Sequence, residues 1–113
     1  MINYYAGILL LLFAGHALAD FPLQGDYLSK GKNHKMALVG TPWFWCLWAH
    51  ALIHAGMVFL ITRSVAFGLI ELIAHMLIDY GKCEGHLDYT EDQLLHYSCK
   101  VVYWLLIVLV PGV

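Results

Sequence analysis

The chain is short, apolar and weakly charged. Its 113 residues are 61% hydrophobic and 12% charged, with a formal net charge of -2, and the mean hydropathy is +0.69. This composition is too apolar for a soluble domain of this length, and it has no basic stripe of the kind that binds nucleic acid. We therefore expect a single integral-membrane domain over residues 1–113, with no nucleic acid among its partners.

The first predicted helix covers Asn3 to Ala19, because Pro22 disfavours a longer one. The Ala-Leu-Ala sequence at 17–19 also imitates a signal-peptidase site. The opening MINYY lacks the lysine or arginine that a secretory signal requires, so we expect this span to be retained. Asp26 to Thr41 is predicted to be a polar connection, in which His34 is solvated.

Three more apolar spans follow. The second covers Trp43 to Ile61 and opens with tryptophans typical of a membrane interface. The third covers Val65 to Tyr80 and is followed by a polar loop with a solvated His86. The fourth runs to Val110, with Thr90 as its predicted N-cap. Such spans would cross or nearly cross a hydrocarbon core of about 30 Å. The sequence thus predicts an all-α fold, a four-helix transmembrane bundle with up-down topology.

Lysines are concentrated in two of the three predicted loops. Lys30, Lys32 and Lys35 in the first loop and Lys82 in the third outweigh Arg63 in the second. The positive-inside rule then places the first and third loops in the cytoplasm, and both termini on the other side. We expect membrane lipids around the chain, and the sequence leaves open whether it forms a homo-oligomer.

Each predicted helix carries polar residues four positions apart, which therefore share one helical face. The third span is the clearest case, because Glu71, His75 and Asp79 interrupt an otherwise apolar segment. In an up-down arrangement all of these residues fall in the same, cytoplasmic half of the membrane. The complete set is His16 and Asp20, His50 and His54, Glu71, His75 and Asp79, and Asp92 and His96.

Ionisable side chains are costly to bury unless something binds them, and a divalent metal ion satisfies this set most simply. Histidine and carboxylate donors suit Zn²⁺, Mn²⁺ or Fe²⁺, and nine donors exceed what one ion can use. We therefore expect about two ions, with a packing network of the same residues as the alternative. The expected ligands are His16, Asp20, His50, His54, His75, Asp79, Asp92 and His96.

The remaining polar residues near these pairs are expected to support the ligands or the reaction. Glu71 would be a further ligand or the general base. Four others would orient the ligands or contact an anionic group of the substrate, namely Gln24, Asp26, Lys82 and Gln93.

Four ordered motifs also carry a resemblance to a known family. They are HxxxDFxxQ from His16 to Gln24, HxxxH from His50 to His54, HxxIDxxK from His75 to Lys82, and DQxxH from Asp92 to His96. With them the chain resembles a family of small bacterial and phage membrane proteins known as a domain of unknown function. The resemblance implies that the polar residues of the motifs are the functional set, and it favours a bacterial inner membrane. A looser likeness is to membrane-bound metal-dependent hydrolases.

Three functions fit this pattern to different degrees. The leading hypothesis is a membrane metal-dependent hydrolase acting on a lipid, a phosphate ester or a membrane peptide. A protein that transports, binds or senses a transition metal is the second. A transporter, however, needs polar residues in both membrane halves, whereas Ile8 to Phe13 and Val101 to Val110 are almost wholly apolar. Haem bound by two histidines is the third, and it gives no use for a carboxylate beside nearly every histidine.

Overall fold

The computed structural model describes residues 1–36 and 38–113. All regular elements of this described part are helical, which confirms the predicted all-α class. In chain order they are α1 (Ile2–Asp20), α2 (Gly25–Gly31), a 3-10 helix η1 (His34–Met36), α3 (Trp43–Thr62), α4 (Val65–Cys83) and α5 (Tyr89–Leu109).

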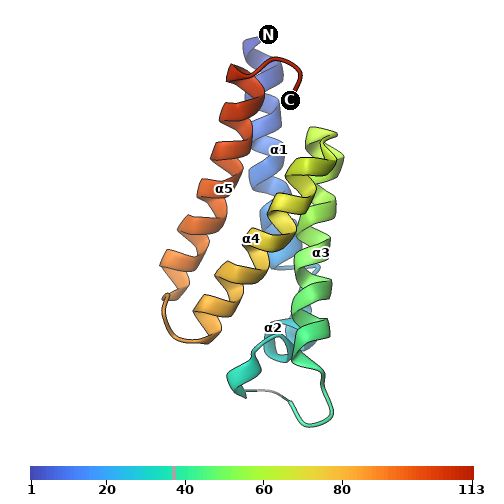
Figure 1. Cartoon of the computed structure of the whole chain (residues 1–113), viewed down its shortest axis with the longest axis vertical. Coiled ribbons are helices and arrows are strands. Elements are labelled where there is room, and N and C mark those ends of the chain that lie inside the picture. The colour runs from blue at the N-terminus through green and yellow to red at the C-terminus, as the bar shows by residue number, and fades with distance from the viewer. Residues whose placement is uncertain (37) are drawn as a thin grey trace.

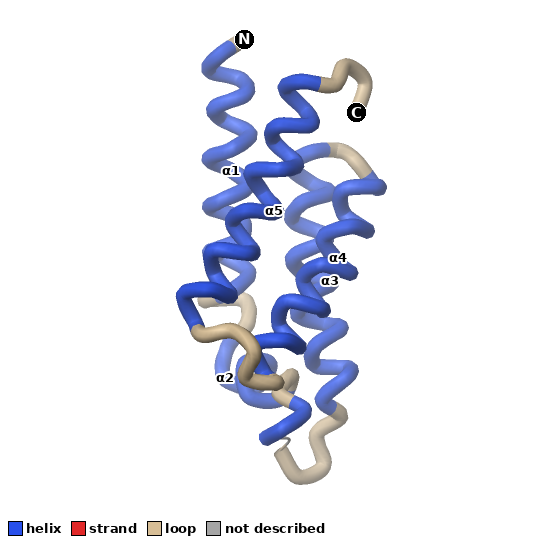
Figure 2. Tube along the Cα trace, turned by 60° about the vertical axis from the view of Figure 1, so that its left-hand side comes forward, coloured by secondary structure: helices blue, strands red, loops and turns tan. Residues whose placement is uncertain are grey.

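The four long helices alternate in direction and give an elongated molecule (Figure 1). The molecule measures 50 × 23 × 22 Å along its principal axes. Helix α3 packs along α4, and α1 contacts both α3 and α5. Both termini lie at one end of the molecule, and α2 with its flanking loops lies at the other, as Figure 2 also shows. We call these the terminal end and the α2 end.

The connection after α1 contains a helix that the sequence analysis did not predict. Helix α2 begins at Gly25, which takes a positive φ of 64°. Asp26 lies in its first turn and Lys30 in its last. This placement complements the helix dipole and puts the two charges four residues apart, so it stabilises even a short helix.

The expectation that His34 is solvated was wrong. Its ring stacks on Tyr80, with 4.0 Å between ring centroids and 4° between ring planes. Its Nε2 atom lies 2.6 Å from Oε1 of Glu84, and Lys35 Nζ lies 3.2 Å from the other carboxylate oxygen. Stacking and a charge-assisted hydrogen bond together fix η1 against the end of α4.

The junction between α3 and α4 is tight. Helix α3 ends at Arg63, which adopts a left-handed φ of 59°, and Ser64 caps α4 by accepting a hydrogen bond from Phe67 N. A Cβ atom on Gly68 would lie only 3.3 Å from the Ala55 backbone oxygen. The missing side chain therefore lets α3 and α4 approach closely.

Helix α5 starts two residues earlier than expected, because Asp88 rather than Thr90 is its N-cap. The Asp88 carboxylate accepts a hydrogen bond from Glu91 N at 2.7 Å, and the Glu91 carboxylate accepts one from Asp88 N at 3.1 Å. This reciprocal capping box satisfies two backbone donors at once.

The molecule buries polar side chains and exposes apolar ones. Many large apolar residues on the long helices are exposed, and five of them are 56% to 71% exposed, namely Leu10, Leu60, Leu69, Leu77 and Leu109. Among the described residues, ten polar or charged ones are buried, namely His16, Lys32, His50, His54, Glu71, His75, Asp79, Asp92, His96 and Lys100. This is the reverse of the usual distribution in a water-soluble domain.

The largest buried apolar cluster joins the four long helices. It consists of Ile8, Leu12, Val58, Phe67 and Tyr103. Leu12 lies near the middle of α1, and the other four belong to the halves of their helices that are nearer the terminal end. The polar residues are thus concentrated toward the α2 end.

Two helices are long and apolar enough to cross a membrane by length and composition, α1 and α3. Four spans were predicted. Helices α4 and α5 are as long, but they contain buried charged residues, Glu71 and Asp79 in one and Asp92 and Lys100 in the other. These charges lower the average apolarity of both helices, although their exposed faces are apolar.

Candidate metal centre

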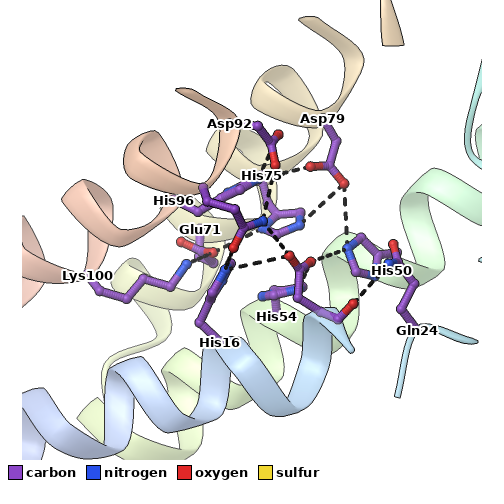
Figure 3. A network of polar contacts seen from close by, with 12 residues as sticks. His16, Gln24, His50, His54, Glu71, His75, Asp79, Asp92, His96 and Lys100 are labelled. Atoms are coloured by element: carbon purple, nitrogen blue, oxygen red, sulfur yellow. Dashed lines mark hydrogen bonds and ion pairs between the residues drawn. The ribbon is translucent and has the colours of Figure 1, made fainter. Parts of the chain in front are cut away.

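The predicted polar pairs of the four long helices meet in one buried cluster (Figure 3). Their side chains are at most 10% exposed. Each helix supplies one pair because the spacing of four residues points both side chains of a pair to the same face. The pairs are His16 and Asp20 from α1, His50 and His54 from α3, His75 and Asp79 from α4, and Asp92 and His96 from α5.

The first group of potential ligands joins three helices. It contains Asp20, His50, His54 and His75, each of which offers one atom within 4.8 Å of the atoms of the others. Asp20 Oδ1 lies 3.1 Å from His50 Nε2 and 3.2 Å from His54 Nε2. Three imidazoles and one carboxylate are a donor set suited to a small divalent ion.

The second group joins α4 and α5. It contains Asp79, Asp92 and His96, whose ligand atoms also lie within 4.8 Å of one another. His96 Nε2 lies 2.9 Å from Asp79 Oδ1 and 3.3 Å from Asp92 Oδ1. This group has more carboxylates and fewer imidazoles than the first.

Asp79 faces both groups. Its Oδ1 atom is the one next to His96, whereas its Oδ2 atom lies 3.5 Å from both His50 Nε2 and His75 Nε2. Oδ2 also accepts a hydrogen bond from Lys32 Nζ at 2.8 Å. The two oxygens of one carboxylate therefore connect the two groups, which is the geometry that a bridging ligand needs.

Unpaired atoms inside the cluster fit a bound cation. His75 Nε2 and Asp92 Oδ1 are buried and have no hydrogen-bond partner among the described residues. A neutral imidazole nitrogen with a free lone pair and a carboxylate oxygen repel each other unless a proton or a cation lies between them. Buried polar atoms without partners are rare in folded proteins. Bound metal ions would give these atoms the partners that hydrogen bonds within the cluster do not provide.

His16 belongs to the cluster but to neither group of ligands. Its Nε2 atom lies 3.1 Å from Gln93 Oε1 and 3.6 Å from Asp20 Oδ2. Gln93 in turn donates hydrogen bonds to Asp20 at 2.7 Å and to Asp92 at 3.2 Å. Gln24 donates to the backbone oxygen of Asp20 at 2.9 Å. Gln93 is therefore placed to orient two carboxylates, whereas Gln24 contacts the backbone of Asp20 and not its carboxylate.

A cavity of about 400 Å³ borders the cluster at the α2 end. Asp20 and Asp92 line it on the cluster side, and the predicted residues Asp26 and Lys82 line it elsewhere. Neither Asp26 nor Lys82 contacts the potential ligands in the described structure. The cavity gives the buried cluster one polar opening.

Glu71 lies on the other side of the cluster, toward the apolar core. Its Oε1 atom lies 3.3 Å from His75 Nδ1 and accepts a hydrogen bond from Lys100 Nζ. Its Oε2 atom accepts a hydrogen bond from the Tyr103 hydroxyl at 2.8 Å. Glu71 also has an oxygen within 4.8 Å of ligand atoms of His75 and His96. Both of its oxygens are thus engaged by residues of α4 and α5.

A family model described as a protein of unknown function, DUF3307, matches residues 8–111. The chain belongs to this family. The match spans all four motifs and confirms the predicted domain of unknown function. No curated protein and no solved structure matches the chain.

Three polar residues of this DUF3307 protein join the network without having been predicted. Lys100 continues the four-residue spacing of Asp92 and His96, so this spacing could have revealed it. Tyr103 is another turn further along the same helix. Lys32 gives no such signal, because it comes from the connection between α1 and α3 and reaches the cluster only through the fold.

Proposed function

We propose that this protein is a membrane-embedded metal-dependent hydrolase with a two-ion site. The observation that carries the proposal is the pair of ligand groups that border a polar cavity, with Asp79 of the second group also facing the histidines of the first. The DUF3307 family brings no activity of its own to this argument. The proposal rests on the chemistry of the site.

A four-helix transmembrane bundle accounts best for the inverted burial. The four long helices have 19 to 21 residues, which corresponds to about 28–31 Å of helix and thus to a hydrocarbon core of about 30 Å. The apolar surfaces of α4 and α5 face outward, and their charges face inward. The lysine-rich loops lie at the α2 end, so the positive-inside rule puts the site near the cytoplasmic leaflet of a bacterial inner membrane.

The two ligand groups suggest how the ions are held. One ion would be bound by Asp20, His50, His54 and His75, and the other by Asp92 and His96, with Asp79 between them. Zn²⁺, Mn²⁺ and Fe²⁺ all accept such nitrogen and oxygen ligands. Bound divalent ions lower the pKa of water and polarise a phosphoryl or acyl oxygen, which is the chemistry that hydrolysis needs.

Glu71 is better suited to positioning than to proton transfer from water. When His75 Nδ1 carries the proton, it donates to Glu71, and Nε2 keeps its lone pair for an ion. Lys100 and Tyr103 hold the Glu71 carboxylate on the side away from the cavity. Asp92 has an unpaired oxygen and lines the cavity, so it is the better candidate for a general base or an exchangeable ligand.

The apolar core favours a hydrolase over a metal transporter. A transporter needs a polar route through both halves of the membrane. Here the polar network reaches inward to Lys100 and Glu71, but Ile8, Leu12, Val58 and Phe67 fill the space beyond them. The cluster therefore opens toward one side, where it can receive a substrate. A metal-binding or sensing protein is the remaining alternative.

Elemental analysis of the protein purified in detergent and supplemented with metal tests this proposal. We expect about two divalent ions per chain, together with hydrolysis of at least one member of a panel of phosphate esters, lipids and peptides. His54→Ala and His75→Ala should lose metal and activity, whereas the exposed His86→Ala should keep both. A wild-type chain without stoichiometric metal would show that the cluster is only a packing network.

A further inference from the structure

We infer that the cavity beside the cluster is a binding site for a phosphate group, held by Lys32 and Lys82. The inference narrows the substrate of the proposed hydrolase to phosphate-bearing molecules, and it rests on that proposal for the two ions. Binding of phosphate can be measured separately from binding of metal, so the two ideas can fail separately.

The cavity has the size and position of a substrate site. Its volume of about 400 Å³ lies within the range of about 300–1,000 Å³ that is common for small-molecule sites. Asp20 and Asp92 belong both to its lining and to the two ligand groups. A group bound in the cavity would therefore lie next to the ions.

Lys32 is a buried ammonium with a donor to spare. Its side chain is 9% exposed, and Nζ donates to Gln24 Oε1 at 2.6 Å and to Asp79 Oδ2 at 2.8 Å. An ammonium group has three N–H donors. No third acceptor for Nζ occurs in the described part of the chain, and Lys32 lines the cavity. The third donor is thus available to a ligand.

Lys82 supplies a second positive charge at the same cavity. Its Nζ atom lies 4.6 Å from the centre of the Tyr89 ring, in a cation-π contact. No carboxylate of residues 1–36 and 38–113 lies within 4.0 Å of this ammonium. The aromatic ring therefore holds the charge in place without neutralising it, and both Lys82 and Tyr89 line the cavity.

The charge of the loaded site selects an anion. Two divalent ions and the two lysines would together exceed the combined charge of the four carboxylates in and beside the cavity, Asp20, Asp26, Asp79 and Asp92. A phosphate group has several oxygens that can accept hydrogen bonds from ammonium groups and also approach metal ions. A neutral peptide bond has one such oxygen and carries no negative charge to offset the excess. Phosphate chemistry therefore fits the cavity better than peptide chemistry.

Calorimetric titration of inorganic phosphate into the metal-loaded full chain in detergent, after removal of unbound ions, tests the inference. We expect saturable binding, and Lys82→Gln should weaken it by about tenfold or more, since a charge-assisted contact is lost. Lys82→Arg should retain most of the affinity. Lys30→Gln is the matched control, because Lys30 is exposed on α2 and does not line the cavity. Metal content is measured in every sample.

The outcomes separate the two ideas. If the chain holds its ions but phosphate does not bind, or binds equally well to Lys82→Gln and wild type, the phosphate site is wrong while the metal site stands. If the wild-type chain holds no ions, both are wrong. A loss of phosphate affinity in Lys82→Gln with unchanged metal content supports the phosphate site.

A second arm identifies the source of the phosphate. The chain is placed in nanodiscs of phosphatidylcholine, with or without phosphatidic acid, and titrated again with inorganic phosphate. If phosphatidic acid lowers the apparent phosphate affinity in the wild type but not in Lys82→Gln, the natural ligand is a lipid headgroup. If phosphatidic acid has no effect on the phosphate affinity of the wild type, the ligand is a soluble phosphate ester. Both results uphold the phosphate chemistry.

Discussion

Lys100 on α5 donates a hydrogen bond to Glu71 on α4, and each of these residues is only 1% exposed. The pair lies between the ligand cluster and the apolar core. Tyr103 donates to the second Glu71 oxygen, and His75 contacts the first. The ion pair therefore joins two neighbouring helices and at the same time orients a potential metal ligand.

Removing one partner of this pair should be costly. Lys100→Met would leave the Glu71 carboxylate buried without its cation, which typically costs about 3–5 kcal/mol. The measurement is thermal or denaturant-induced unfolding of the protein in detergent, followed by circular dichroism. The exposed Lys30→Met should change the free energy of unfolding by less than about 0.5 kcal/mol.

The double variant Lys100→Met/Glu71→Gln distinguishes the effect of an unpaired buried charge on stability from the effect of altered side-chain packing. It removes both charges, so it should recover much of the stability lost in Lys100→Met. It should still bind metal more weakly than wild type, because the carboxylate that orients His75 is gone. Equal stability of wild type and Lys100→Met would contradict a buried ion pair.

Asp79 should matter to both ions, because its two oxygens face the two ligand groups. Asp79→Asn should therefore lower the metal content from about two ions per chain to less than one. Asp92→Asn removes a ligand from the second group alone and should leave about one ion. Elemental analysis after dialysis gives both values. Equal metal content in the two variants would argue against a bridging role for Asp79.

The contact between η1 and α4 should depend on pH. Hydrogen bonds from His34 and Lys35 lower the pKa of Glu84 from its usual 4.5 to about 2. Because the folded protein favours the charged form of the Glu84 carboxylate, the contact stabilises the folded protein fully above about pH 4.5. The stabilisation is lost as the pH falls from there through about 2.

Comparison of wild type with Glu84→Gln tests this pH dependence. At neutral pH the variant should unfold at a lower temperature than wild type. The difference between the two unfolding temperatures should shrink steadily in acid and vanish below about pH 2. His86→Gln, which changes an exposed residue of the next loop, should unfold like wild type over this acidic range. A difference between wild type and Glu84→Gln that is the same at all pH values would show that the carboxylate charge plays no part.

The two termini should be found on the same, non-cytoplasmic side of the membrane. They lie at the same end of the molecule, opposite the lysine-bearing α2 end. Reporter fusions at Met1 and after Val113 determine the side, and intact-mass measurement shows whether the first span is retained. Termini on opposite sides would rule out four crossings, and a cytoplasmic location of both would reverse the orientation.

The sequence by itself determined the helices and the residues that share their faces. Apolar runs that end at Ala19, Ile61 and Tyr80 define the ends of the first three long helices to within a few residues, because these signals are local. The spacing of four between His75 and Asp79, and between Asp92 and His96, follows from helix geometry alone. Hence the potential ligands could be named before the fold was known.

Only the tertiary structure decided how these residues divide into groups and what surrounds them. That Asp79 faces both groups depends on the packing of α4 against α3 and α5, which no local pattern encodes. The place of Lys32 depends on the path of the chain through α2, because a flexible side chain in a connection has no periodicity to reveal it. Contacts between residues far apart in sequence are set by packing. The potential metal ligands could therefore be identified from the sequence, whereas their arrangement in space depends on the fold.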